Sequence, residues 1–176
     1  MNRLIYFSEG GRCCHDERYT AFLDYAFAQN DCFLLVYPFR RGSRYAAALR
    51  EYRDALAPYL VKMRREPYWP GTVLPYSETV RYEVSFYRTA PEAKEVLRRA
   101  EALTDWAAPR LPQDLAFFRR SCCWFYYSCQ EHTAAVLHAS PRDLAFLAEH
   151  QLADPANALP EDRYFDLCNE PLDSLR

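Results

Sequence analysis

The residues best suited to acid–base chemistry lie in the second half of the chain. Asp114 opens a predicted strand, and Glu131 and His132 follow the strand that is expected to return beside it. If these side chains converge near Trp69 and Trp124, the two carboxylates can act as a general acid and base pair. Carboxylates at strand ends are more often solvated, so we favour the interpretation that none of these residues is catalytic. An enzyme that uses Asp114, Glu131 and a histidine is the alternative hypothesis.

Cysteine is the second residue type that could carry chemistry, because the chain has 7 of them. Cys13 and Cys14 directly precede His15, and Cys129 and His132 have the spacing of a Cys-x-x-His pair. Neither cluster has the second pair that a zinc site requires at a defined distance. We therefore expect thiols in a reducing cytosol, several buried as small apolar side chains, with no metal and no cofactor. A cysteine-based metal or redox sensor is the alternative.

Composition argues against several classes of function. The 4 glycines do not form a dinucleotide-binding or phosphate-cradling loop, and the chain has no nucleophile elbow and no His-Glu-x-x-His sequence. The formal net charge of -2 gives no electrostatic reason to bind nucleic acid or an anionic membrane. No apolar run approaches the roughly 20 residues that span a bilayer, and the apolar start at residues 1–7 is too short for a secretory signal. We expect a cytoplasmic protein.

Hydrophobic periodicity predicts strands and helices that alternate along the chain. Because 50% of the residues are hydrophobic and 16% are aromatic, the chain can bury a sizeable core. The predicted order is β-α-β-α-β-β-α-β-β-α, an α+β fold with a single mostly antiparallel sheet and helices packed mainly on one face. We expect one domain over residues 1–152 and an extended C-terminal tail over 153–176 that packs on it. The expected strands cover residues 4–8, 32–37, 59–65, 79–88, 115–119, 122–129 and 133–138, the last being either a separate strand or the continuation of the hairpin before it. The expected helices begin at Asp16, Ser43, Thr89 and Ser140.

Two local patterns make sharper predictions. Apolar and polar residues alternate over residues 79–88, so the side of this strand that carries Glu83 and Ser85 is expected to face water. The sequences that begin at Thr89 and Ser140 each place an acidic residue three positions later, with a proline between them, which is typical of a capped helix start. Both patterns place polar groups where water or a helix terminus can satisfy them.

Aromatic side chains crowd both faces of the predicted hairpin at residues 115–129. Because helices are expected to cover only one side of the sheet, one face of the hairpin is expected to be exposed to solvent. The uncovered face, or the aromatic loop near residue 68, is therefore expected to bind a partner, since Trp, Tyr and Arg are typical interface anchors. The predicted partner-binding residues are Tyr68, Trp69, Arg119, Arg120, Trp124 and Glu131.

Three segments resemble a bacterial cytosolic family whose members are sometimes labelled as sporulation stage III proteins. They are residues 69–72 (Trp-Pro-Gly-Thr), residues 111–115 (Leu-Pro-Gln-Asp-Leu) and residues 124–131, which begin with Trp and end in Gln-Glu. The family pattern has Leu-Pro-Glu-Asp-Leu in the second segment and His-Glu at the end of the third. Gln113 and Gln130 therefore replace an acid and a histidine. The resemblance covers roughly residues 60–150 and implies no defined activity, and the two replacements weigh against an enzyme.

The sequence thus predicts a non-enzymatic module with a protein partner. Its concrete form is an immunity-like or inhibitory protein that covers the partner. A small hydrolase or transferase is the first alternative, and a cysteine-based sensor is the second. The three require different geometries: an enzyme needs a pocket where acidic groups converge, a binding module needs an exposed patch, and a metal sensor needs at least three Cys or His side chains at one point.

Overall fold

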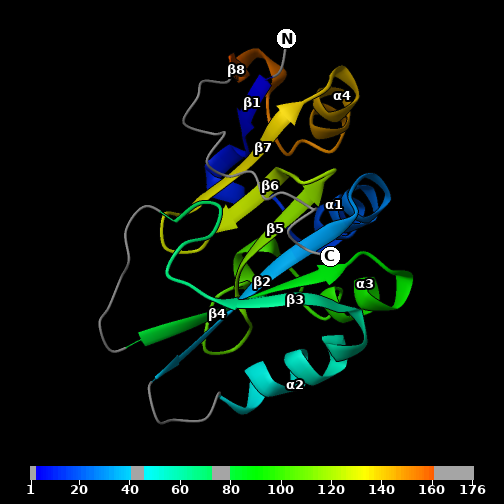
Figure 1. The fold of residues 1–176 in the computed structure, drawn as a ribbon. Coiled ribbons are helices and arrows are strands. Elements are labelled where there is room, and N and C mark those ends of the chain that lie inside the picture. The colour runs from blue at the N-terminus through cyan, green and yellow to red at the C-terminus, as the bar shows by residue number, and fades with distance from the viewer. Residues whose placement is uncertain (1–2, 41–45, 73–79, 161–176) are drawn as a thin grey trace.

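An eight-stranded antiparallel sheet organises the protein, as seen in a computed structural model that describes residues 3–40, 46–72 and 80–160 (Figure 1). The strand order is β3-β4-β2-β5-β6-β7-β1-β8, which confirms the α+β class and the single antiparallel sheet. The strands are β1 (Arg3–Tyr6), β2 (Cys32–Arg40), β3 (Leu60–Arg65), β4 (Val80–Arg88), β5 (Gln113–Arg119), β6 (Cys122–Ser128), β7 (Thr133–Ala139) and β8 (Leu159–Pro160). The helices are α1 (Asp16–Gln29), α2 (Ala47–Leu56), α3 (Pro91–Leu97) and α4 (Pro141–Glu149), with short 3₁₀ turns η1 (Ser8–Gly11), η2 (Ala57–Tyr59), η3 (Leu103–Asp105) and η4 (Pro155–Asn157).

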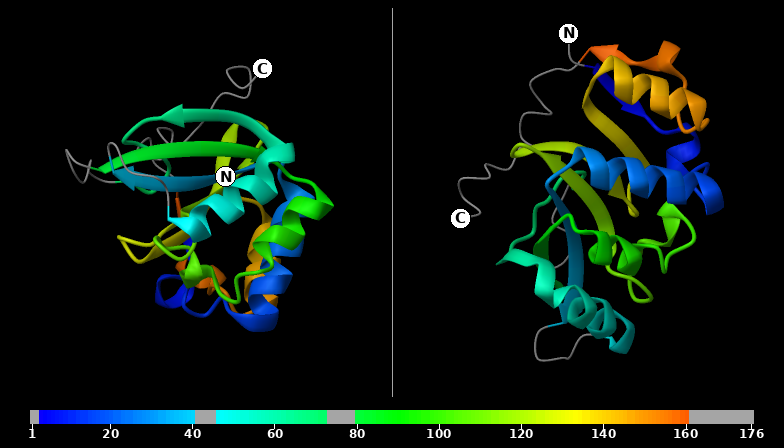
Figure 2. Two further views of the ribbon diagram at one scale, coloured as in Figure 1. Left: turned by 90° about the horizontal axis from the view of Figure 1, so that it is seen from below. Right: turned by 90° about the vertical axis from the view of Figure 1, so that its right-hand side faces the viewer.

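The α-helices of the described residues lie together on one face of the sheet (Figure 2). The core between them and the sheet is strongly aromatic. Phe22 of α1 has ring neighbours in Phe7, Phe117, Trp124 and Phe125, at centroid distances between 4.7 and 6.3 Å. Large rings bury much apolar area, so this cluster supplies a large share of the driving force for packing the helices on the sheet.

The helix starts predicted at Ser140 and at Thr89 differ in outcome. At α4 the prediction is confirmed, because the Ser140 hydroxyl accepts from the Asp143 N–H and the Asp143 carboxylate accepts from the Ser140 N–H. At α3 it is wrong: the helix begins after Ala90, and the Thr89 hydroxyl donates to the Asn30 carbonyl at 2.7 Å. Thr89 therefore joins the loop before β2 to the loop after β4 and leaves the helix uncapped. The predicted cap at Ser43 lies outside the described residues.

The prediction that one side of β4 faces water is wrong. Glu83 and Ser85 are each 1% exposed, and Val84 and Phe86 on the opposite side are also buried. β4 lies between β3 and β2, and Arg53 of α2 reaches the Glu83 carboxylate at 3.0 Å from the helix side. Strict alternation is typical of a half-buried strand, but a polar residue with a charged partner can also occupy the buried side.

The face of the sheet away from the helices is also apolar and buried. It carries a second core cluster that includes Leu34 of β2, Phe118 of β5 and Tyr126 of β6. Phe118 is 1% exposed and Tyr126 is 7% exposed. The expectation that one face of the β5–β6 hairpin is an open aromatic patch is therefore wrong.

Irregular pairing breaks the alternation of three strands in the middle of the sheet. Register shifts fall at Asp114 in β5, at Trp124 in β6 and at His138 in β7. Because of the shift in β6, the adjacent residues Trp124 and Phe125 both belong to the core under the helices. Asp114 and His138 have φ values of 58° and 53°, in the left-handed region that few residues other than glycine adopt. These bulges re-aim side chains in a way that a period of two does not predict.

The sheet continues past the predicted domain boundary at residue 152, because Leu159 of β8 pairs with Leu4 of β1. The remainder of the predicted tail, residues 161–176, lies outside the described residues. None of the helices in the described ranges combines the length and apolar character needed to cross a membrane.

Candidate functional site

The three segments that stand out in the sequence meet at one buried carboxylate. Asp114 is 3% exposed and accepts a hydrogen bond from the Trp69 indole Nε1–H at 2.6 Å. Its other oxygen accepts from the Cys129 backbone N–H at 2.7 Å. The first donor lies in the loop after β3 and the second lies directly after β6. We call Asp114, Trp69 and Cys129 the Asp114 node, and it ties that loop to one end of the β5–β6 hairpin.

Residues 69–72 supply the turn that carries the indole to this position. The Thr72 N–H donates to the Trp69 carbonyl at 3.0 Å, and Gly71 has a φ of 87°. Proline followed by a glycine with positive φ is the signature of a type II turn. A Cβ on Gly71 would lie 2.7 Å from the Tyr126 ring, so the turn packs directly on β6. The Trp-Pro-Gly-Thr sequence is thus explained by backbone conformation and close packing.

The electrostatics of the Asp114 node do not favour nucleophilic chemistry. Burial raises the pKa of Asp114, and the hydrogen bonds from Cys129 and Trp69 offset this only in part. Burial and the neighbouring Asp114 charge raise the pKa of the Cys129 thiol to about 12. The thiol is therefore protonated near neutral pH, and a protonated thiol is a poor nucleophile. Both carboxylate oxygens already accept N–H groups, so the node acts as a structural clamp.

A second buried carboxylate, Asp143, joins α4 to the other end of the hairpin. It accepts from the Arg119 guanidinium at 3.1 and 3.4 Å, from the Tyr25 hydroxyl at 2.8 Å and from the Ser140 hydroxyl at 2.7 Å. Burial alone would raise the pKa of Asp143, but the hydrogen bonds from Arg119 and Ser140 outweigh it and lower the pKa. The same guanidinium lies over the Trp124 ring, 5.1 Å from its centroid. Arg119 is thus engaged in holding the fold together.

The predicted partner-binding residues do not share one surface. Trp124 is 1% exposed within the core under the helices, whereas Trp69 is 7% exposed within the cluster on the opposite face. Arg120 lies in the turn that joins β5 to β6, and Glu131 lies in the turn that joins β6 to β7. Because successive turns of a meander lie at opposite ends of its strands, these two residues are at opposite ends of β6. Tyr68 has the largest exposed fraction among these aromatics, at 57%.

The carboxylates considered for acid–base catalysis are placed in different environments. Asp114 is enclosed by Trp69 and Cys129, while Glu131 and His132 are exposed in the turn between β6 and β7. Trp69 and Trp124, between which the pair was expected, belong to cores on opposite faces of the sheet. The geometry therefore builds no acid–base site between the two tryptophans.

The cysteines that the structure describes are dispersed. Within residues 3–40, 46–72 and 80–160, no group of three Cys, His, Asp or Glu side chains is placed to hold a metal. Cys14 is fully buried, and the Cys13 thiol donates to the Leu152 carbonyl at 3.4 Å. His15 contacts the Asp16 carboxylate at 2.8 Å. Cys168 lies outside the described residues.

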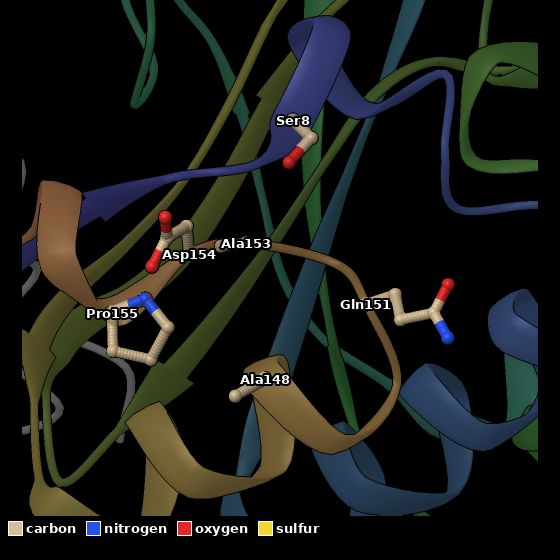
Figure 3. Close-up of a pocket in the computed structure, with 6 residues that line it drawn as sticks. All are labelled: Ser8, Ala148, Gln151, Ala153, Asp154 and Pro155. Atoms are coloured by element: carbon tan, nitrogen blue, oxygen red, sulfur yellow. The ribbon is translucent and has the colours of Figure 1, made fainter.

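A pocket of about 350 Å³ lies where η1 meets the segment after α4 (Figure 3). Two of its polar side chains already have partners: Gln151 accepts from Arg18 at 2.6 Å, and Asp154 accepts from the Ala156 N–H at 2.9 Å. Ser8 supplies the hydroxyl of the lining. This pocket offers no arrangement of groups for catalysis. Its lining residues are Ser8, Ala148, Gln151, Ala153, Asp154 and Pro155.

Exposed large apolar side chains gather at β3, the strand that ends the described sheet on one side. Leu60, Val61 and Met63 are 47%, 43% and 39% exposed, and Tyr68 follows three residues after the strand. The strand was expected from the sequence at residues 59–65, but its exposure was not. The alternation of apolar and basic residues from Val61 to Arg65 is a signal that could have shown it, since charged residues are typical of edge strands.

Comparison with known proteins does not assign the chain to a family. No family model, no curated protein and no solved structure matches the chain. Its function therefore has to be inferred from the geometry described above.

Proposed function

We propose that this chain is a protein-binding module that contacts its partner through the β3 edge, which we define as Leu60, Val61, Met63 and Tyr68. The observation that carries the proposal is that four exposed large apolar side chains fall within residues 60–68, on and just after an edge strand, with exposed fractions between 39% and 57%. Single exposed apolar residues are ordinary, but several within one short segment are typical of an interaction surface. Figure 1 shows β3 running along the outer side of β4.

The energetics favour a partner at this edge. Fully burying one large apolar side chain contributes about 1.5–3 kcal/mol, so covering the exposed half of all four is worth roughly 3–6 kcal/mol before the costs of association. The edge is also ordered by the sheet, because β3 pairs with β4 from Leu60 to Arg65, with one register shift between Leu60 and Lys62, and residues 82–87 of β4 are buried. A preordered surface loses little conformational entropy on binding. These features support an inhibitory or immunity-like action in which the edge covers part of a partner.

The surroundings of the buried carboxylates Asp114 and Asp143 also favour a binding module over an enzyme. Asp114 and Asp143 are buried carboxylates that each accept several hydrogen bonds from groups of other segments of the fold. Glu131 and His132, the other residues considered for acid–base chemistry, are exposed in a turn and not enclosed with Asp114. An interaction surface is therefore the simpler reading of the geometry.

An affinity pull-down from native lysate tests this function with two matched double variants. Val61→Ser/Met63→Ser removes apolar area from the β3 edge, and Tyr6→Ser/Leu159→Ser removes similarly exposed residues, 42% and 48%, from the opposite end of the sheet. A stoichiometric partner should be retained by the wild type and the control variant and lost by the edge variant. A partner retained equally by all three proteins, or no stoichiometric partner, would reject the proposal.

A further inference from the structure

We infer that residues 161–176, the C-terminal segment of this chain, dock across the face of the sheet that the described helices leave free and cover its apolar cluster. We call this side of the sheet the helix-free face. The inference is independent of the binding function proposed for the β3 edge, because it concerns a face of the sheet and not its border. It depends on the burial of that face, on a continuous row of paired residues across it, and on the length, start and composition of the C-terminal segment.

The helix-free face is as closed as the face under the helices. Figure 2 shows the described helices gathered on one side of the sheet, yet Leu34 of β2 and Leu137 of β7, on the other side, are both 0% exposed. The loop that carries Trp69 covers part of this face, because its Gly71 packs on the Tyr126 ring of β6. A sheet face is closed to water only where a second layer packs on it, so β2 and β7 need a covering segment as well.

A row of directly paired residues crosses the helix-free face from β1 to β4. Directly paired residues of neighbouring strands point to the same side of a sheet, so this row does not depend on alternation along any one strand. It crosses six strands and is about 24 Å long at roughly 4.8 Å between neighbours. The first residue is 42% exposed, and the others are buried. In order, the row consists of Tyr6, Ala135, Tyr126, Ala116, Leu34 and Phe86.

The C-terminal segment has the length to cover this row. Its 16 residues span about 50 Å when extended at roughly 3.3 Å per residue, which is twice the length of the row. The ranges 41–45 and 73–79 also lie outside the described residues, but they are shorter and are tied at both ends to described elements. Length therefore selects residues 161–176 as the cover.

The segment also starts at the exposed end of the row. β8 ends at Pro160, which pairs with Arg3 of β1, and β1 is the strand that carries Tyr6 (Figure 1). The covalent connection at Pro160 holds the segment near the helix-free face at an effective concentration on the order of millimolar. A second copy of the chain at lower concentration would have to displace it, so the intramolecular occupant is favoured.

The composition of the segment suits an apolar face. Tyr164, Phe165 and Leu167 stand close together in it, and we call them the apolar triplet. Large apolar side chains at this density are not typical of a segment that stays solvated. The short side chains of Ala135 and Ala116 leave space between their larger neighbours in the row, and the apolar triplet can fill it. Such packing removes apolar area from water on both partners.

Photo-crosslinking in the full chain locates the segment. The photoreactive amino acid p-benzoylphenylalanine would be incorporated at position 165, and cross-linked peptides would be identified by mass spectrometry after irradiation of dilute protein. Cross-links within one chain to β5, β6 or β7 are expected, because these strands carry the middle of the row.

Thiol reactivity measures the cover independently. Cys32 and Cys123 belong to the cluster on the helix-free face, whereas Cys14 belongs to the core under the helices. All three are at most 3% exposed. A short pulse of N-ethylmaleimide, followed by mass spectrometry of each cysteine peptide, gives the alkylation rate at each thiol, and Cys14 reports any general opening of the fold.

Two variants of the full chain provide the matched comparison. Tyr164→Ser/Phe165→Ser/Leu167→Ser should speed alkylation of the two thiols on the helix-free face by about tenfold or more, because loss of the cover opens that face locally. The thiol under the helices should change by less than about twofold, since its own cover is intact. Asp162→Ser/Asp166→Ser alters acidic positions of the same segment and should leave all three rates within about twofold of the wild type, because exposed polar substitutions have small effects.

Several outcomes would overturn this docking. Cross-links from position 165 to the helices, or only between two copies of the chain, would reject the helix-free face as its site. Unchanged alkylation of Cys32 and Cys123 in the triplet variant would reject it equally. The same acceleration at Cys14 would also reject it, because the segment would then not cover one face selectively. None of these outcomes bears on the β3 edge, which the lysate pull-down tests separately.

Discussion

The Asp114 node and the β3 edge differ in burial: the node is enclosed by the protein, and the edge is exposed to solvent. The node gathers the most recognisable sequence segments, and every polar group that defines it has a partner inside the protein. The β3 edge has no recognisable motif, and its apolar side chains face solvent. The comparison shows that a conspicuous sequence pattern can report a backbone requirement, such as the turn at Gly71. An inconspicuous strand at the sheet border can be the surface available for function.

The first way to break this comparison is to remove the Asp114 carboxylate. Asp114→Ala leaves the buried Trp69 and Cys129 N–H groups without an acceptor, at about 1–3 kcal/mol each, so we expect a loss of roughly 2–6 kcal/mol in the free energy of unfolding. Urea denaturation measures it, with the exposed Glu149→Ala as the control within about 0.5 kcal/mol. A stable Asp114→Ala protein that loses only a binding or catalytic activity would make the node functional.

Gly71→Ala tests the packing of the turn on β6. Its φ of 87° is unfavourable for alanine, and the new Cβ would lie 2.7 Å from the Tyr126 ring. We expect a loss of about 2–3 kcal/mol, since a left-handed residue costs roughly 1–2 kcal/mol before the contact is counted. Gly71→Asn separates the two causes in the same urea experiment, because asparagine tolerates the left-handed conformation but carries the same Cβ. If Gly71→Asn has the same free energy of unfolding as the wild type, close packing on Tyr126 is not the reason for glycine at this position.

The two buried carboxylates should respond to pH in opposite directions. The pKa of Asp114 is raised above 3.8 in the folded protein, so the unfolded chain ionises first and this group's contribution to stability falls as pH rises through that window. The pKa of Asp143 is lowered below 3.8, so its contribution is present above that pH and is lost as pH falls through the folded value.

Unfolding free energies of Asp114→Asn and Asp143→Asn relative to wild type would measure this difference across acidic pH. The destabilisation by Asp143→Asn should grow with rising pH, and that by Asp114→Asn should shrink. If the destabilisation by the two variants changed with pH in the same way, Asp114 and Asp143 would have similar electrostatic environments.

The smallest expected effect is on the fold when the β3 edge is altered. Val61→Ser/Met63→Ser should change the free energy of unfolding by no more than about 1 kcal/mol, because exposed substitutions have small effects. Urea denaturation beside the Asp114→Ala protein gives the contrast directly. A loss as large as that of Asp114→Ala would mean that Val61 and Met63 belong to the core and would remove the basis for a docking edge.

The sequence alone determined much of the local structure. Apolar spacing predicted α1, and the sequence at Ser140 predicted the start of α4, because both ends of the hydrogen bonds that cap this helix lie within one turn. The β5–β6 hairpin was also predicted, since its two apolar runs flank a short polar turn. Such features depend on residues that are close along the chain.

Only the tertiary structure decided which surfaces are closed and which are open. Burial of Glu83 depends on Arg53 of α2, and burial of Trp124 depends on a bulge in β6. The convergence of Trp69 and Asp114 depends on strands distant in sequence. The exposure of β3 depends on its place at the end of the strand order. The physical reason is that periodicity reports one residue's neighbours along the chain, whereas burial is set by pairing across the sheet and by layers packed on it.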